Sequence, residues 1–170
     1  MADRRTDRHG NESSMNGLTL KPPNRPSALP SAGRLLAVDL GAKRIGLALS
    51  DESQTIAHPL TTLTRRAGRR FPLKQLRAVI ADHQPVGILV GLPLESDGSE
   101  AQPAADARSV GRLITDKSGL PVDFLDERMT TARALRAVRE MGGGIRGRKQ
   151  DVDPLAATTL LQTFLDGRRR

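Results

Sequence analysis

The 170-residue sequence contains no cysteine, no tryptophan and no tyrosine, and aromatic residues make up only 2% of it. The lack of cysteine excludes disulfides and thiolate-bound metals, and it is consistent with a reducing environment. With only three phenylalanines available, the hydrophobic core must be built from Leu, Val, Ile and Ala. The apolar residues cluster after position 34, so we expect one folded domain of about 130 residues.

Long apolar runs are also missing. No stretch approaches the roughly 18 consecutive apolar residues that a membrane-spanning helix needs. The N-terminal residues are charged and include no apolar segment of the kind found in signal peptides. We therefore expect neither a secretory signal nor a membrane partner.

Positive charge is in excess, with 27 Lys and Arg against 19 Asp and Glu and a formal net charge of +8. This favours a polyanionic partner such as nucleic acid, although excess charge also serves solubility. Residues 1–33 are polar, basic and interrupted by prolines, which predicts a disordered basic tail. The tail is interpreted either as a solvated extension or as an arm that touches phosphates. Residues 34–167 form the predicted domain, and 168–170 a basic C-terminal end.

The first part of the domain predicts a hairpin. Residues 35–38 are apolar, Asp39 interrupts the run and Gly41 permits a bend, so strands are expected at 35–40 and 44–50. A third strand at 56–64 contains Pro59, which favours a sheet edge or a bulge. The arginines that follow, from Arg65 to Arg70, are equally consistent with a solvated loop and a phosphate-contacting patch.

The rest of the domain alternates helices and strands. Helical spacing of apolar residues predicts helices at 71–83, 101–117, 132–141 and 153–165, and apolar runs predict strands at 86–92 and 121–125. A strand, a helix and a strand in succession imply a parallel, right-handed crossover. The predicted fold is therefore α/β, with a mixed five-stranded sheet that joins an antiparallel hairpin edge to parallel strands and is flanked by helices.

Three acids lie at the ends of predicted elements: Asp39 near the end of the first strand, Glu127 after the last strand and Asp153 at the start of the last helix. Ligands of α/β sheets collect at the carboxyl ends of parallel strands, and the first and last strands can be neighbours. Carboxylates brought together repel unless a divalent cation lies between them, and oxygen ligands favour Mg²⁺ or Mn²⁺. Such a cation can activate water and stabilise charge on a phosphoryl oxygen.

Each acid also has a purely structural interpretation. Asp39 can shape the hairpin as an Asx-turn residue, Glu127 can pair with a surface arginine such as Arg128, and Asp153 can cap the last helix. Five further acids compete with these three and are equally consistent with solvated loops, namely Asp51, Asp97, Glu100, Asp126 and Asp151.

Four separated motifs occur in collinear order between residues 35 and 166. They are DLGAKRIGLALSD at 39–51, VGLPL at 90–94 with Asp97-Gly98, DERMTT at 126–131, and VDPLAA at 152–157 with Leu161-Gln162. Together they resemble the YqgF/RuvX family of proposed pre-16S rRNA nucleases, which are also described as Holliday-junction-resolvase-like. Pro154 departs from the ordinary helix former expected after the third acid, but it suits a first helical turn.

The resemblance implies an RNase H-like fold and a cytoplasmic, metal-dependent endonuclease that hydrolyses phosphodiester bonds during 5′-end maturation of precursor 16S rRNA. It also implies that Asp39, Glu127 and Asp153 are the catalytic acids and hold Mg²⁺ or Mn²⁺. The candidate phosphate contacts are Lys43, Arg44, Arg128, Arg146, Arg148 and Lys149. The expected partners are precursor rRNA, branched DNA and ribosomal particles, and the expected state is a monomer or a homodimer.

Three alternatives remain open at this point. The first is a junction resolvase on branched DNA, and the second is a non-catalytic factor that binds nucleic acid. The third is a phosphate-binding module of the actin and sugar-kinase type, which needs two such domains where this chain has room for one. With few aromatic residues for base stacking, backbone contacts should dominate binding, which should weaken steeply with salt.

Overall fold

The computed structural model describes residues 27–65, 70–130 and 152–169. Its elements are β1 (Leu35–Leu40), β2 (Arg44–Ser50), β3 (Ala57–Thr64), α1 (Leu73–His83), β4 (Gly87–Leu92), α2 (Gln102–Ser118), β5 (Val122–Asp126), the short 3₁₀ helix η1 (Glu127–Met129) and α4 (Val152–Arg168). The predicted strands and three of the predicted helices are thus confirmed, with small shifts at their ends. The predicted helix at 132–141 lies outside the described residues. No helix in the described ranges is long and apolar enough to cross a membrane.

The five strands form one sheet in the order β3-β2-β1-β4-β5. The pairs β1–β2 and β2–β3 are antiparallel, and β1–β4 and β4–β5 are parallel. The predicted mixed sheet with an antiparallel hairpin edge is confirmed. The prediction for Pro59 is also confirmed, because β3 is an edge strand and its register shifts beside this residue.

The expectation that the first and last strands can be neighbours is wrong. The chain leaves β1 through the hairpin, returns through α1 to place β4 beside β1, and then passes through α2 to add β5 outside β4. Both crossovers extend the sheet in the same direction, so β4 separates β1 from β5.

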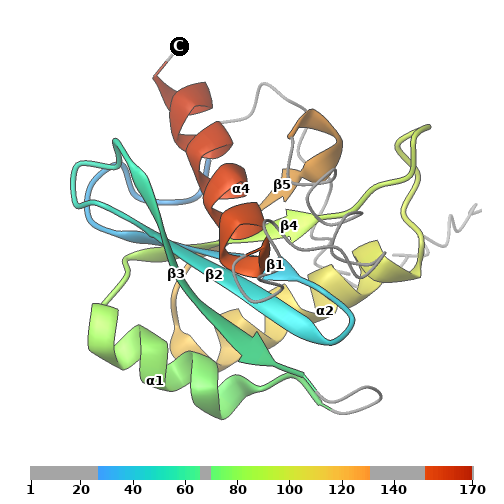
Figure 1. The fold of residues 1–170 in the computed structure, drawn as a ribbon, viewed down its shortest axis with the longest axis horizontal. Coiled ribbons are helices and arrows are strands. Elements are labelled where there is room, and N and C mark those ends of the chain that lie inside the picture. The colour runs from blue at the N-terminus through green and yellow to red at the C-terminus, as the bar shows by residue number, and fades with distance from the viewer. Residues whose placement is uncertain (1–26, 66–69, 131–151, 170) are drawn as a thin grey trace, which may run out of the picture.

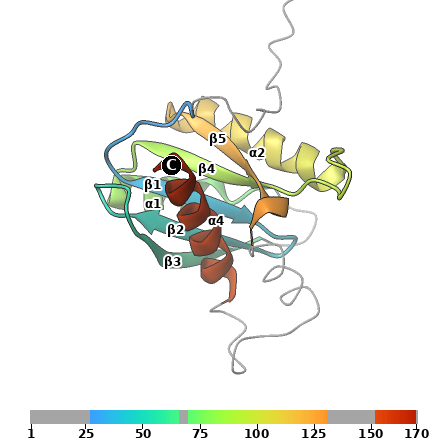
Figure 2. The ribbon, with the colours of Figure 1, turned by 90° about the horizontal axis from the view of Figure 1, so that it is seen from above.

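Helices cover both faces of the sheet, with α1 and α2 on one face and α4 on the other (Figures 1 and 2). Because side chains alternate along a strand, Leu36 and Val38 enter the core beneath α1 and α2, whereas Leu35 and Ala37 enter the core beneath α4. The same alternation directs Asp39 to the α4 face. This face is therefore where the first candidate acid is found.

Residues 27–33, which the sequence assigned to the tail, pack against the domain. Leu29 is only 3% exposed and joins the core beneath α4. The guanidinium of Arg168, at the end of α4, donates to the carbonyl oxygens of Leu29 and Pro30, both at 2.9 Å. The remainder of the proposed 1–33 tail lies outside the described residues, and the proposed division into tail, domain and basic end stays a prediction.

The connection between β2 and β3 is organised by Asp51. Its carboxylate oxygen Oδ1 accepts hydrogen bonds from the N–H groups of Thr55 at 2.6 Å and Ile56 at 2.9 Å, and Oδ2 accepts one from the Ser53 hydroxyl. These bonds, first of all the one from Ser53, lower the pKa of Asp51 from 3.8 to about 2. Asp51 therefore shapes a turn, which is the structural interpretation of one of the competing acids.

We expect the Asp51→Asn variant to be less stable than the wild type at pH 7, with a difference that shrinks in acid. The pKa of Asp51 is lower in the folded state than in the unfolded chain, so its contribution to stability is present above about pH 4 and is lost as the pH falls through about 2. Urea unfolding midpoints measured across this pH range test the expectation. Asp116→Asn, at an exposed position on α2, is the control. A difference between Asp51→Asn and wild type that stays the same throughout would contradict it.

Candidate active site

Asp39 lies between two glycines on the α4 face of the sheet. It is 1% exposed and opposes Gly46 on β2 in the antiparallel register. On the other side, the pairing of Val38 with Val90 places Gly91 at the following position of β4. No side chain therefore projects from the sheet on either side of Asp39.

The place above Gly46 is taken by the first turn of α4. A Cβ atom at Gly46 would lie 1.9 Å from the carbonyl oxygen of Asp153, so the helix rests directly on β2. The Asp153 side chain is fully buried, and its Oδ2 lies 3.7 Å from Nη1 of Arg44. Asp153 is in the first turn of α4, where the helix dipole favours a negative charge. The structural interpretation of Asp153 and its candidate role in the site are therefore compatible.

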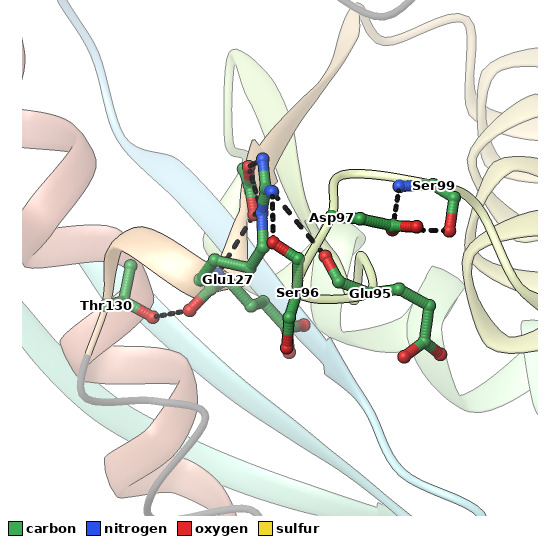
Figure 3. A network of polar contacts seen from close by, with 8 residues as sticks. Glu95, Ser96, Asp97, Ser99, Glu127 and Thr130 are labelled. Atoms are coloured by element: carbon green, nitrogen blue, oxygen red, sulfur yellow. Dashed lines mark hydrogen bonds and ion pairs between the residues drawn. The ribbon is translucent and has the colours of Figure 1, made fainter.

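The place above Gly91 is taken by the side chain of Glu127. A Cβ atom at Gly91 would lie 2.2 Å from Oε1 of Glu127, which is 2% exposed. Glu127 begins η1, and its carbonyl oxygen accepts hydrogen bonds from the N–H and the hydroxyl of Thr130, both at 3.1 Å (Figure 3). Although β5 is at the edge of the sheet, Glu127 thus reaches back over β4.

The three predicted acids consequently form a row on one face of the sheet, with Asp153 over β2, Asp39 on β1 and Glu127 over β4. The spacing of neighbouring strands, about 4.8 Å, sets the step between these positions. We call this set the acidic row. Burying carboxylates costs free energy unless positive charges or hydrogen-bond donors compensate, and Arg44 supplies one such charge to Asp153.

The acidic row suits a hard divalent cation by its chemistry, because all its donors are carboxylate oxygens. Its geometry does not yet form a three-ligand site. Within residues 27–65, 70–130 and 152–169, no three His, Asp or Glu residues are placed so that they could hold one metal ion. Coordination by all three acids therefore requires a change in side-chain or main-chain position.

A basic pair lies at the same end of the sheet. Lys43 is exposed in the loop between β1 and β2, and its carbonyl oxygen accepts the N–H of Arg65 at 2.8 Å. This bond continues the β2–β3 ladder by one position beyond Arg44 and Thr64. Like charges directly opposite each other on two strands are unfavourable, so the pair suits an anionic ligand better than it suits stability. The sequence left the role of Arg65 open, and only the strand pairing places it beside Lys43.

The remaining predicted phosphate contacts lie elsewhere. The guanidinium of Arg128 binds the carboxylate of Asp126, with Nε–Oδ2 and Nη2–Oδ2 distances of 2.9 and 2.6 Å. The arginine that the sequence offered as a partner for Glu127 thus forms an ion pair with the preceding acid. Three further candidates, Arg146, Arg148 and Lys149, lie outside the described residues.

Sequence comparisons identify relatives over most of the chain. The family RuvX, described as Holliday junction resolvase, matches residues 33–167. The chain is 41% identical over 141 residues to a protein of Koribacter versatilis. This match covers 82% of this chain and 92% of the relative. It is 36% identical over 148 residues to one from Cutibacterium acnes, with 86% and 90% covered. Both relatives carry the name "Putative pre-16S rRNA nuclease".

Solved structures with a similar chain path include two resolvases. The structure of T. thermophilus RuvC in complex with Holliday junction substrate has a TM-score of 0.48 and 15% identity, covering 81% of this chain and 96% of that one. The Fowlpox virus resolvase with Holliday junction DNA has a TM-score of 0.49 and 8% identity, covering 81% and 99%. These structural likenesses are distant, whereas the sequence matches are strong enough to show the family of the chain.

The mixed five-stranded α/β sheet is the fold that the resemblance implied, and the sequence relatives define a nuclease, which is a hydrolase acting on phosphodiester bonds. More particularly, the chain belongs to the RuvX family. The predicted fold class and the family resemblance are thereby confirmed.

The two glycines of the site should respond differently to alanine. At Gly91 the added Cβ meets the end of the flexible Glu127 side chain, so we expect the carboxylate to move and the free energy of unfolding to change by less than about 1 kcal/mol. At Gly46 it meets the main chain of Asp153, so α4 must shift, at a cost of about 1–3 kcal/mol.

Chemical denaturation of Gly46→Ala and Gly91→Ala measures this difference. Gly167→Ala on α4 is the control, because a Cβ atom there would meet nothing within 4 Å. Equal stability of Gly46→Ala and the wild type would show that α4 does not rest on β2 as described.

Proposed function

We propose that this protein is a metal-dependent endonuclease that hydrolyses phosphodiester bonds during 5′-end maturation of precursor 16S rRNA. The observation that carries the proposal is the acidic row, in which Asp39, Glu127 and Asp153 are buried together at the carboxyl ends of parallel strands. The names of the relatives supply the substrate class.

The acidic row is the proposed site for Mg²⁺ or Mn²⁺. Such a cation supplies charge stabilisation at the phosphoryl oxygens and lowers the pKa of bound water. Asp39 contributes a carboxylate fixed by the sheet on both sides, because β1 pairs with β2 and β4. Glu127 contributes a carboxylate that lies over Gly91, and its side chain can adjust by rotation about one more bond than that of an aspartate. The proposal requires this adjustment, since the three acids, as the described part of the chain places them, are not positioned to hold one metal ion together.

The charges around the acidic row fit a phosphodiester backbone. The Arg44 side chain is 37% exposed and contacts Asp153, and the main chains of Lys43 and Arg65 pair one position beyond Arg44 at the same end of the sheet. These three residues are proposed to bind the phosphates that flank the scissile bond. Arg146, Arg148 and Lys149, which the family resemblance implied as phosphate contacts, remain proposed contacts.

A second candidate is cleavage of branched DNA, which the description of the matching family favours. The two activities would share the acidic row and differ in the nucleic acid that the surface accepts. A junction resolvase presents two sites and would act as a homodimer, whereas an rRNA nuclease can act as a monomer, in the cytoplasm and with ribosomal particles as partners. Binding without cleavage would instead indicate a non-catalytic factor.

We expect the purified protein to cleave a precursor 16S rRNA fragment with Mg²⁺ or Mn²⁺ and to lose this activity with EDTA. Asp39→Asn should lower the cleavage rate at least about a hundredfold, because charge stabilisation by a metal ion is worth several kcal/mol, and should leave binding largely intact. Asp116→Asn is the matched control, far from the row on the exposed face of α2.

A four-way DNA junction assayed in parallel separates the candidates. Cleavage of the junction alone would favour the resolvase. Full activity of Asp39→Asn, or binding of both substrates without cleavage of either, would contradict the proposed enzyme.

The basic pair should contribute to binding and little to the chemical step. We expect Lys43→Gln and Arg65→Gln each to weaken binding and to reduce the slope of log Kd against log salt by about 0.7–0.9, as for one lost phosphate contact. Lys117→Gln, in the last turn of α2, is the control. Titrations by fluorescence anisotropy at several salt concentrations give the slopes, and unchanged slopes for both variants would remove the pair from the binding surface.

A further inference from the structure

We propose that Arg128 is a positioning residue, which holds Glu127 over β4 by joining η1 to the connection between β4 and α2. The inference rests on the proposed function, in which Glu127 is an acid of the active site. It gives Arg128 a role within the protein in place of the phosphate contact expected from the sequence.

The two residues that flank Glu127 are bonded to each other. The Arg128 guanidinium contacts the Asp126 carboxylate through Nε, at 3.1 Å from Oδ1 and 2.9 Å from Oδ2, and through Nη2, at 2.6 Å from Oδ2. The main-chain N–H of Arg128 also donates to Asp126 Oδ1, at 3.0 Å. The hydrogen bonds with Asp126 are the main cause that raises the pKa of Arg128. The residues before and after Glu127 are thus joined by charged hydrogen bonds, which restrain the main chain of Glu127.

Arg128 also contacts the connection between β4 and α2. Nη1 of Arg128 lies 3.5 Å from the carbonyl oxygen of Glu95 and 3.4 Å from that of Ser96 (Figure 3). Gly98 lies close to this guanidinium, since a Cβ atom there would lie 3.1 Å from Nη1. Gly98 also has φ = +89°, a conformation that residues with side chains rarely adopt. The guanidinium therefore packs against a turn in which Gly98 leaves space for it.

This turn is itself closed by hydrogen bonds. The N–H of Gly98 donates to the carbonyl oxygen of Glu95 at 2.9 Å, and the N–H of Glu95 donates to that of Ser99 at 3.0 Å. Asp97 Oδ1 accepts from the N–H and the hydroxyl of Ser99, at 2.8 and 2.6 Å. These bonds from Ser99 lower the pKa of Asp97, and the charge of Arg128 adds to the effect. Arg128 consequently docks on a structured element.

The position of this turn explains why the contact matters for Glu127. The Glu127 carboxylate lies over Gly91, and the chain continues from β4 directly into the turn that Arg128 contacts. β5, which delivers Glu127, is an edge strand, and η1 is only three residues long. Arg128 thus ties the main chain of Glu127 to the strand over which its carboxylate must lie.

Kinetics of Arg128→Ala and Arg128→Lys distinguish positioning from phosphate binding. A misplaced Glu127 should lower kcat by about tenfold to a hundredfold in both variants, with KM and the salt dependence of binding unchanged. Lysine keeps the charge but cannot form the forked bond to Asp126, so it should fail to rescue activity. Arg112→Ala, on the exposed side of α2, is the control. A raised KM and reduced salt slope in Arg128→Ala, with activity retained in Arg128→Lys, would overturn the proposal.

Hydrogen exchange provides a readout that does not depend on activity. In Arg128→Ala, the amides of residues 95–99 and 127–130 should exchange at least about tenfold faster than in the wild type, because charged hydrogen bonds are lost. Asp126→Ala should have the same effect, and the double variant should show little further change. Unchanged exchange in Arg128→Ala would overturn the proposal. If the wild type cleaves neither substrate, the proposed function fails, and the exchange data still decide whether Arg128 joins the two elements.

Discussion

The acidic row depends on the absence of side chains at Gly46 and Gly91. Any Cβ atom at these positions would collide with Asp153 or with Glu127, which approach the sheet on either side of Asp39. The two glycines allow α4 and η1 to come close enough for three carboxylates to share one face. A site of this kind is set by the space that the sheet leaves, because carboxylates by themselves repel one another.

The free energy that offsets this repulsion comes from the apolar part of α4. Leu160, Leu161 and Leu165 of this helix are at most 1% exposed and pack against the sheet together with Leu35 and Leu89. Each buried leucine contributes about 1.5–3 kcal/mol, so the three together are of the same order as the several kcal/mol that burying a carboxylate costs. The same helix that stabilises the domain thus places Asp153 beside Asp39, so stability and the proposed site depend on one contact surface.

Basic residues are arranged in two ways around the site. Arg44 and Arg128 each contact an acid of the protein, whereas Lys43 and Arg65 oppose each other just beyond the ends of β2 and β3. The first arrangement holds the active-site elements in place, and the second leaves positive charge available to a polyanion. Basic residues that look equivalent in the sequence motifs therefore have different structural roles.

Periodicity and motif order in the sequence determined the strands, most of the helices, the mixed sheet and the family, because these depend on local patterns and on the succession of elements. Only the tertiary structure decided that β4 separates β1 from β5, that Arg128 pairs with Asp126 and that Arg65 lies opposite Lys43. It also showed that the three acids share a face without yet forming a three-ligand site. These features depend on which distant segments pack together, and hydrophobic periodicity along the chain does not specify such contacts.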